Sequence, residues 1–113
     1  MQNEDAAPPK AGAVDHRAGP RRRSLKGGRI IYGNLSLSMD CMVRSMSSSG
    51  ARLEFAGGGV APDEFYLFIT ADHLIARVAI AWRSATAVGV RFLEPLVHPR
   101  QHPDPRIQHL RLL

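Results

Sequence analysis

Two short polar segments contain the side chains best suited to binding a charged ligand. The first spans residues 21–26 and reads Arg-Arg-Arg-Ser-Leu-Lys, and the second spans residues 45–50 and reads Ser-Met-Ser-Ser-Ser-Gly. Arginine presents a planar fork of N–H donors that suits phosphate and guanine, and serine hydroxyls both donate and accept hydrogen bonds. A basic run alone is also typical of a solvated flank, and a serine-rich segment alone is typical of an ordinary turn. Whether the two segments form a binding site therefore depends on the other sequence features near them.

Signatures of common catalytic sites are absent from the sequence. It contains no Gly-x-Ser-x-Gly elbow, no phosphate-binding glycine-rich loop with lysine and no Cys-x-x-Cys pair. Residues 57–59 are three glycines, but they lack the strand-to-helix context of a nucleotide fingerprint and predict a hairpin turn. We therefore expect a protein that is not an enzyme.

The five histidines do not follow a metal-binding pattern. Four of them lie in the terminal segments, at His16, His98, His102 and His109. His98 and His102 are four positions apart, but Pro99 between them argues against the helix that would align them as ligands. His73 follows Asp72 in a predicted surface turn. We expect solvated histidines and no metal site.

The net charge of +5 is concentrated in one short cluster and the C-terminal end. Residues 21–29 contain four arginines and one lysine but no acid, whereas residues 30–96 contain five arginines against six acids. A nearly neutral body with few aromatic residues, mostly at positions expected to face inward, argues against an oligonucleotide-binding barrel, which needs aromatic platforms on a basic groove. We expect no nucleic-acid partner.

The remaining composition is that of one small domain. The 113 residues include a single cysteine, Cys41, which excludes an intramolecular disulfide and is predicted to be a small core residue. The first residues have no leader pattern, and no apolar run approaches the roughly 20 residues that span a bilayer, so we expect a cytoplasmic location without membrane insertion. Residues 1–20 are rich in proline, alanine and glycine and predict a disordered tail.

Most of the chain shows the two-residue period of strands that have one buried face. The alternating runs are residues 35–44, 51–55, 76–83 and 88–92. Residues 65–70 are apolar on both sides, which predicts a strand covered on both faces. With a first strand at residues 29–32, six strands separated by short turns predict an all-β fold, either a small antiparallel barrel or a sandwich.

The C-terminal residues 97–113 are predicted to be a tail or a short helix. Asp104 followed by Pro105 matches a capping acid with proline at the first helical position. So short a helix persists only if its apolar residues, Ile107 and Leu110, dock against the barrel.

The order of these features resembles the PilZ family of bacterial cyclic di-GMP receptors. A basic motif precedes the first strand, a Ser-x-x-Gly sequence joins strands two and three, and Ala-Arg-Leu-Glu follows at residues 51–54. Trp-Arg at residues 82–83 and Val-Gly-Val-Arg-Phe at residues 88–92 are similar to the final hairpin of that family. The resemblance covers roughly residues 20–95. It implies a six-stranded antiparallel β-barrel of Greek-key or split-barrel type, often with a C-terminal helix.

The resemblance also implies a ligand site. The first family motif, Arg-x-x-x-Arg on a flexible segment, matches residues 22–26 with lysine in the last position, and the second, Asp/Asn-x-Ser-x-x-Gly, matches residues 45–50 with serine in the first. The implied residues for cyclic di-GMP are Arg22, Arg23, Lys26, Ser45, Ser47 and Gly50. Lys26 lacks the fork of arginine and Ser45 is shorter than Asp or Asn, so each departure costs about 1–3 kcal/mol of binding.

The function implied is that of a signalling receptor with a downstream protein partner and without a cofactor. Cyclic di-GMP would bind as a monomer or as an intercalated dimer. The alternative is a degenerate PilZ-like adaptor that has lost the nucleotide and acts through protein contacts. The expected layout is a tail at residues 1–20, a barrel domain at residues 21–96 that begins with a basic arm at residues 21–29, and the C-terminal segment.

Overall fold

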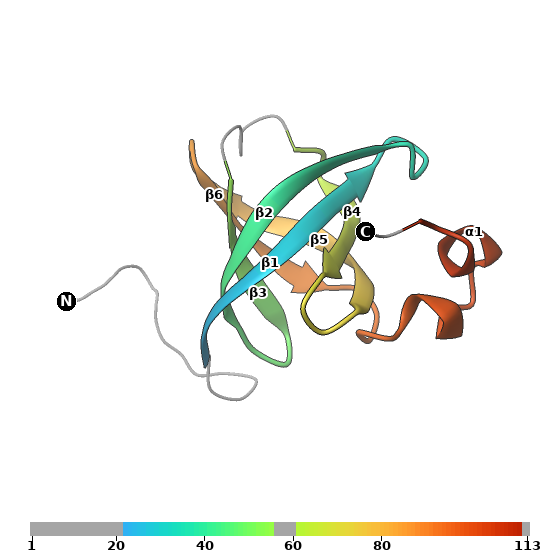
Figure 1. Ribbon diagram of the computed structural model, residues 1–113. Helices are drawn as coiled ribbons and strands as arrows, with labels where there is room; N and C mark the ends of the chain where they lie inside the picture. The colour runs from blue at the N-terminus through green and yellow to red at the C-terminus, as the bar shows by residue number, and fades with distance from the viewer. Residues whose placement is uncertain (1–21, 56–60, 112–113) are drawn as a thin grey trace.

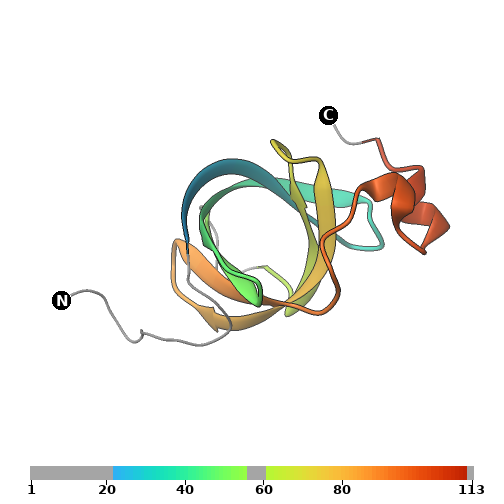
Figure 2. The ribbon, with the colours of Figure 1, turned by 90° about the horizontal axis from the view of Figure 1, so that it is seen from below.

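The strands of this chain close into a barrel. The structure, a computed structural model, describes residues 22–55 and 61–111, with side chains from Leu25 onward, so the predicted tail at 1–20 and the turn at 57–59 lie outside it. Within the described residues, six antiparallel strands form a closed barrel in the order β1-β2-β3-β6-β5-β4 (Figures 1 and 2). They are β1 (Arg22–Tyr32), β2 (Leu37–Met46), β3 (Gly50–Glu54), β4 (Glu64–Ile69), β5 (Leu74–Arg83) and β6 (Ala87–Phe92). The all-β prediction is confirmed, and the pairing of β1 with β4 decides for a barrel over a sandwich.

Apolar residues of the alternating runs fill the barrel. Every strand contributes a fully buried side chain to this core, and six of these are Ile30, Val43, Leu53, Leu67, Val78 and Val88. Burial of one such side chain stabilises the fold by about 1.5–3 kcal/mol. Cys41 lies in the same core, as predicted, and burial, followed by the charge of Asp40, raises the pKa of its thiol to about 12.

Strand β1 begins at Arg22, so the prediction of a basic arm ahead of a strand starting at Arg29 is wrong. The backbone of the basic segment instead pairs with β2. A Cβ at Gly28 would lie 3.2 Å from both Cys41 Sγ and the carbonyl oxygen of Phe68, so the glycine lets β1 pass close to both neighbouring strands. The alternation pattern missed this stretch because adjacent glycines and clustered charges carry no apolar period.

Strand β5 contains a bulge that turns Trp82 outward. Ile80 pairs with Val90, but the next paired residue is Trp82 opposite Gly89, which leaves Ala81 as an extra residue. One extra residue reverses which face the following side chains occupy. Trp82 is therefore 46% exposed, although the alternation of residues 76–83 places it on the same face as Val78 and Ile80.

The outer face of β4 is covered, as the two-sided apolar character of residues 65–70 predicts. The C-terminal segment folds into the 3-10 helix η2 (Pro99–Gln101) and the short helix α1 (Pro105–Gln108), which lie beside the barrel (Figure 2). Ile107 of α1 is fully buried, and Leu110 packs at the edge of the same cluster. The barrel residues of that cluster are Ile31, Phe68 and Ile75. The docking of both C-terminal side chains is confirmed.

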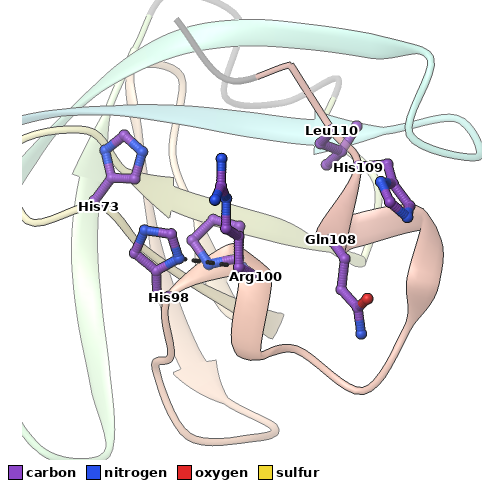
Figure 3. A pocket seen from close by; sticks show the side chains of 7 residues that line it. His73, His98, Arg100, Gln108, His109 and Leu110 are labelled. Atoms are coloured by element: carbon purple, nitrogen blue, oxygen red, sulfur yellow. Dashed lines mark hydrogen bonds between the residues drawn. The ribbon is translucent and has the colours of Figure 1, made fainter.

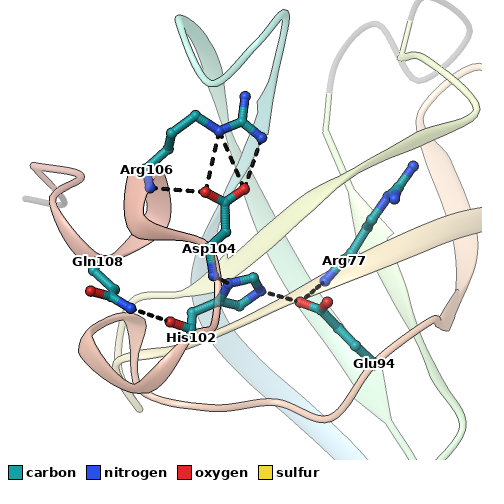
Figure 4. Close-up of polar contacts among 6 residues, drawn as sticks. All are labelled: Arg77, Glu94, His102, Asp104, Arg106 and Gln108. Carbon is teal, nitrogen blue, oxygen red and sulfur yellow. Dashed lines mark hydrogen bonds and ion pairs between the residues drawn. The ribbon is translucent and has the colours of Figure 1, made fainter.

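A buried histidine anchors this C-terminal segment, which corrects the prediction of a solvated His102 (Figure 4). His102 is 4% exposed, its Nδ1 accepts from the Asp104 N–H at 3.0 Å, and its Nε2 therefore donates to Glu94 Oε2 at 2.7 Å. Asp104 caps α1 as predicted, because its carboxylate accepts from the Arg106 N–H at 2.9 Å. Hydrogen bonds from the Arg106 side chain and backbone lower the pKa of Asp104. Gln108 Nε2 donates to the carbonyl oxygen of His102 at 2.7 Å and closes the turn.

Candidate functional site

Pairing between β1 and β2 makes neighbours of the two predicted binding segments. Arg22 and Arg23 lie opposite the last two residues of β2, and Arg23 pairs with Ser45. A bulge separates Arg23 from Lys26, where the regular ladder resumes. Such a bulge adds local twist and changes the direction of the residues around it. The backbones of the basic motif and of the start of the serine motif therefore run side by side, while Arg21 lies outside the described residues.

The loop between β2 and β3 is built by its own serines and by Gly50. The Ser47 N–H donates to the Gly50 carbonyl at 2.8 Å, and the Ser47 hydroxyl accepts from the Ser49 N–H at 3.3 Å. The Phe92 N–H, at the end of β6, donates to the Ser49 carbonyl at 2.9 Å. A Cβ at Gly50 would fall well inside 3.0 Å of the Val90 carbonyl oxygen, a separation that real Cβ atoms essentially never show. Ser47 and Gly50 thus shape the loop through contacts within the protein.

Lys26 forms an ion pair on the side of β1 that lies away from β2. Its Nζ lies 2.6 Å from Asp72 Oδ2, in the turn between β4 and β5, and the two side chains are 37% and 32% exposed. An ion pair at such a site contributes about 0–1 kcal/mol, so a phosphate group competes with it at little cost. Lys26 is consequently available to an anion, although it does not point to the serine loop in this structure.

Two arginines that the sequence motifs do not include flank the loop. Arg91 on β6 pairs with Gly50, and Arg52 on β3 pairs with Ser45. Both side chains are exposed, and Arg52 Nη2 is 3.8 Å from Glu54 Oε2. Alternation indicated that both arginines face outward, but only the strand order β2-β3-β6 shows that they border the serine loop. The described residues around the serine loop therefore include two arginines, Arg52 and Arg91, in addition to the basic residues of the two sequence motifs.

A polar cleft of about 360 Å³ lies elsewhere, between the β4–β5 turn and the C-terminal segment (Figure 3). Its lining residues are His73, His98, Pro99, Arg100, Gln108, His109 and Leu110. The His73 and His98 rings lie 5.2 Å apart, and His98 Nδ1 accepts from the Arg100 N–H at 3.1 Å. None of the six predicted ligand residues lines this cleft, so it is separate from the serine loop.

Other kinds of site find little support in the described part of the chain. Within residues 22–55 and 61–111, no group of three His, Cys, Asp or Glu side chains is placed to hold a metal ion. Cys41 is buried and its thiol stays protonated at neutral pH, which makes it unsuited to act as a nucleophile. No described helix combines the length and the apolar character needed to cross a membrane.

What remains is the surroundings of the serine loop, where Arg52 and Arg91 are exposed on β3 and β6 and the backbone of Arg22 and Arg23 pairs with the end of β2. Such an arrangement can bind phosphate through guanidinium groups and nucleobases through hydrogen bonds and stacking. Comparison with known proteins leaves this geometry as the main guide to function, because no family model matches the chain and no curated protein shows significant similarity to it.

Proposed function

We propose that this protein is a PilZ-type receptor domain for cyclic di-GMP. The observation that supports this most directly is the pairing of β1 with β2, which sets Arg23 beside Ser45 at the start of the serine motif. Cyclic di-GMP carries two phosphate charges and two guanine bases. A cluster of arginines beside a loop of hydroxyls suits both parts of such a ligand, since guanidinium groups fork onto phosphate and guanine O6 and N7.

Each motif residue has a role in this proposal. Arg22 and Arg23 bind phosphate and guanine, and Lys26 adds a point charge for a phosphate after releasing Asp72. Ser45 and Ser47 supply hydroxyls. Gly50 keeps β3 close to β6, so that Arg52 and Arg91 stand next to the loop. The function is recognition followed by a change in contacts with a downstream protein partner, without catalysis or a cofactor, and in the cytoplasm, where this messenger acts.

A second candidate is an adaptor of the same fold that no longer binds nucleotide. Two observations favour it: Lys26 already has a carboxylate partner in Asp72, and Ser45 stands where the PilZ motif has Asp or Asn. The loop geometry does not separate the candidates, because Ser47 and Gly50 hold the turn in either case.

Isothermal titration calorimetry with cyclic di-GMP separates the two candidates. A receptor binds with measurable heat, and Arg23→Ala weakens binding about 5- to 150-fold, the equivalent of about 1–3 kcal/mol for one forked contact. Arg100→Ala, in the C-terminal segment away from the serine loop, is the matched control and keeps the wild-type affinity. Equal losses from both variants would indicate nonspecific charge attraction, and no heat with the wild-type protein would support the adaptor.

A further inference from the structure

Neutral and basic side chains line the polar cleft between the β4–β5 turn and the C-terminal segment. The cleft has a volume of about 360 Å³, and its lining includes His73, His98, Arg100 and His109. Among the described residues, no aspartate or glutamate contributes to this lining. Pockets that hold small molecules begin at about this size, and donors without a competing carboxylate attract anions. The cleft therefore has the size and the charge of a site for a small anion.

Arg100 gives the cleft a permanent positive charge. Six other described arginines form ion pairs with carboxylates, namely Arg29, Arg44, Arg52, Arg77, Arg83 and Arg106. Arg100 is exposed and forms no ion pair with a carboxylate from the described part of the chain. Its side chain extends from η2 into the cleft, beside the rings of His73 and His98 (Figure 3). A guanidinium in this position can hold a phosphate group through two parallel N–H donors.

A backbone hydrogen bond fixes which ring nitrogen of His98 can donate. Its Nδ1 accepts from the Arg100 N–H at 3.1 Å, so the proton of the neutral ring lies on Nε2. No described residue accepts a hydrogen bond from that Nε2–H. The same short segment therefore supplies the cleft with a guanidinium and with a ring donor that is open to a ligand.

His73 holds its ring on the other wall of the cleft. Its φ of +56° lies in the left-handed region, which is uncommon for residues other than glycine. The ring meets Phe68 edge to face at a centroid distance of 5.3 Å and lies 5.2 Å from the ring of His98. The neighbouring acid, Asp72, pairs with Lys26 at 2.6 Å, which offsets its charge beside the cleft. Two imidazoles and one guanidinium thus meet in a place where the adjacent carboxylate is already paired.

We propose that this cleft binds a phosphate group, either as the free ion or as the terminal group of a small phosphorylated molecule. Arg100 makes the charged contact, and His73 and His98 donate from ring nitrogens, which histidine does in its neutral and its protonated form. The site is separate from the serine loop and does not depend on the proposed function. Cyclic di-GMP has no terminal phosphate, because both of its phosphates are closed into the ring.

The two histidine rings could instead serve only to pack the C-terminal segment against the β4–β5 turn. Conservative variants separate the two roles. Asparagine tolerates the left-handed backbone at position 73, so His73→Asn removes the ring and keeps the turn. At position 98, the Oδ1 of asparagine can accept from the Arg100 N–H as Nδ1 does, so His98→Asn removes only the Nε2 donor.

The experiment is a titration of the full chain with inorganic phosphate and with glycerol phosphate at constant ionic strength, followed by amide chemical shifts. We expect saturable shifts at residues 73 and 98–101. Arg100→Ala should weaken binding at least about tenfold, and His73→Asn and His98→Asn about three- to tenfold each. Arg111→Ala should change the affinity less than twofold, because this exposed arginine of the same segment does not line the cleft.

The two ligands distinguish the sources of the phosphate group. Tighter binding of glycerol phosphate assigns the cleft to a phosphorylated small molecule, and equal affinity assigns it to the free ion. Shifts that never saturate, or equal losses in Arg111→Ala and Arg100→Ala, overturn the site, because both indicate general attraction of anions to a basic protein. Unchanged affinity in Arg100→Ala overturns it as well. Saturation in the wild-type protein needs no variant, and a separate titration with cyclic di-GMP tests the proposed function independently.

Discussion

Replacing Gly50 with alanine tests whether the barrel itself requires the motif glycine. The new Cβ would fall well inside 3.0 Å of the Val90 carbonyl oxygen and 3.2 Å from the Val90 carbonyl carbon, both of which are backbone atoms that cannot rotate away. Strands β3 and β6 must then separate by roughly 1 Å, and overpacking of this kind costs about 1–3 kcal/mol. For a domain of this size, we expect the melting temperature to fall by about 5–20 °C.

Gly27→Ala is the matched control. Gly27 also lies in a strand and is exposed, but no heavy atom lies within 4 Å of its built Cβ. Alanine there reduces the freedom of the unfolded chain, so we expect no loss, or a gain of up to about 1 kcal/mol. Thermal unfolding followed by far-ultraviolet circular dichroism, without ligand, measures both variants. Equal melting temperatures for the two proteins would refute the close approach of β3 and β6 as the reason for Gly50.

Three further outcomes are expected. In calorimetry, Ser45→Asn should tighten cyclic di-GMP binding by a few-fold to about tenfold, because one restored hydrogen bond is worth about 0.5–1.5 kcal/mol. The control Ser48→Asn should bring no gain, because any residue type is allowed at that position of the motif. Ile107→Ala removes most of a fully buried side chain and should release the C-terminal segment from the barrel. In this variant, the amides of residues 99–108 should exchange faster than those of the strands, and equal protection of the two regions would contradict the prediction. Cys41, whose thiol pKa is raised to about 12, should react with iodoacetamide at pH 8 only after denaturation, and rapid labelling of the native protein would show that it is not buried.

The regular parts of the barrel could be predicted from the sequence because one face of each strand packs against the core. The alternation of apolar residues located β2, β3 and β6, and the two-sided apolar character of residues 65–70 predicted the cover over β4. The pair Asp104 and Pro105 predicted the start of α1. These features depend on contacts or dihedral angles that are local in sequence.

The parts that the sequence did not reveal depend on single irregular residues and on distant partners. One extra residue at Ala81 turns Trp82 from the core to the surface, and a two-residue period contains no sign of it. His102 can be buried because Glu94 Oε2 accepts a hydrogen bond from its Nε2–H, a pairing that only the folded segment creates. Arg52 was visible as an outward residue, but its place next to Ser45 required knowledge of the strand register.

The C-terminal segment covers only one side of the barrel's outer surface. Ile107 closes the side formed by β1, β4 and β5, where Ile31, Phe68 and Ile75 are buried beneath it. The side formed by β2, β3 and β6 keeps Arg52, Arg91 and, in the serine loop, Ser48 and Ser49 exposed. Ladder pairing across β2, β3 and β6 sets position 23 of β1 and position 82 of β5 in one row, although about sixty residues separate them in the sequence. The proposed ligand face and the docking site of the C-terminal segment therefore lie on different sides of the barrel. Substitutions at Ile107 should change local stability while leaving the proposed nucleotide face intact.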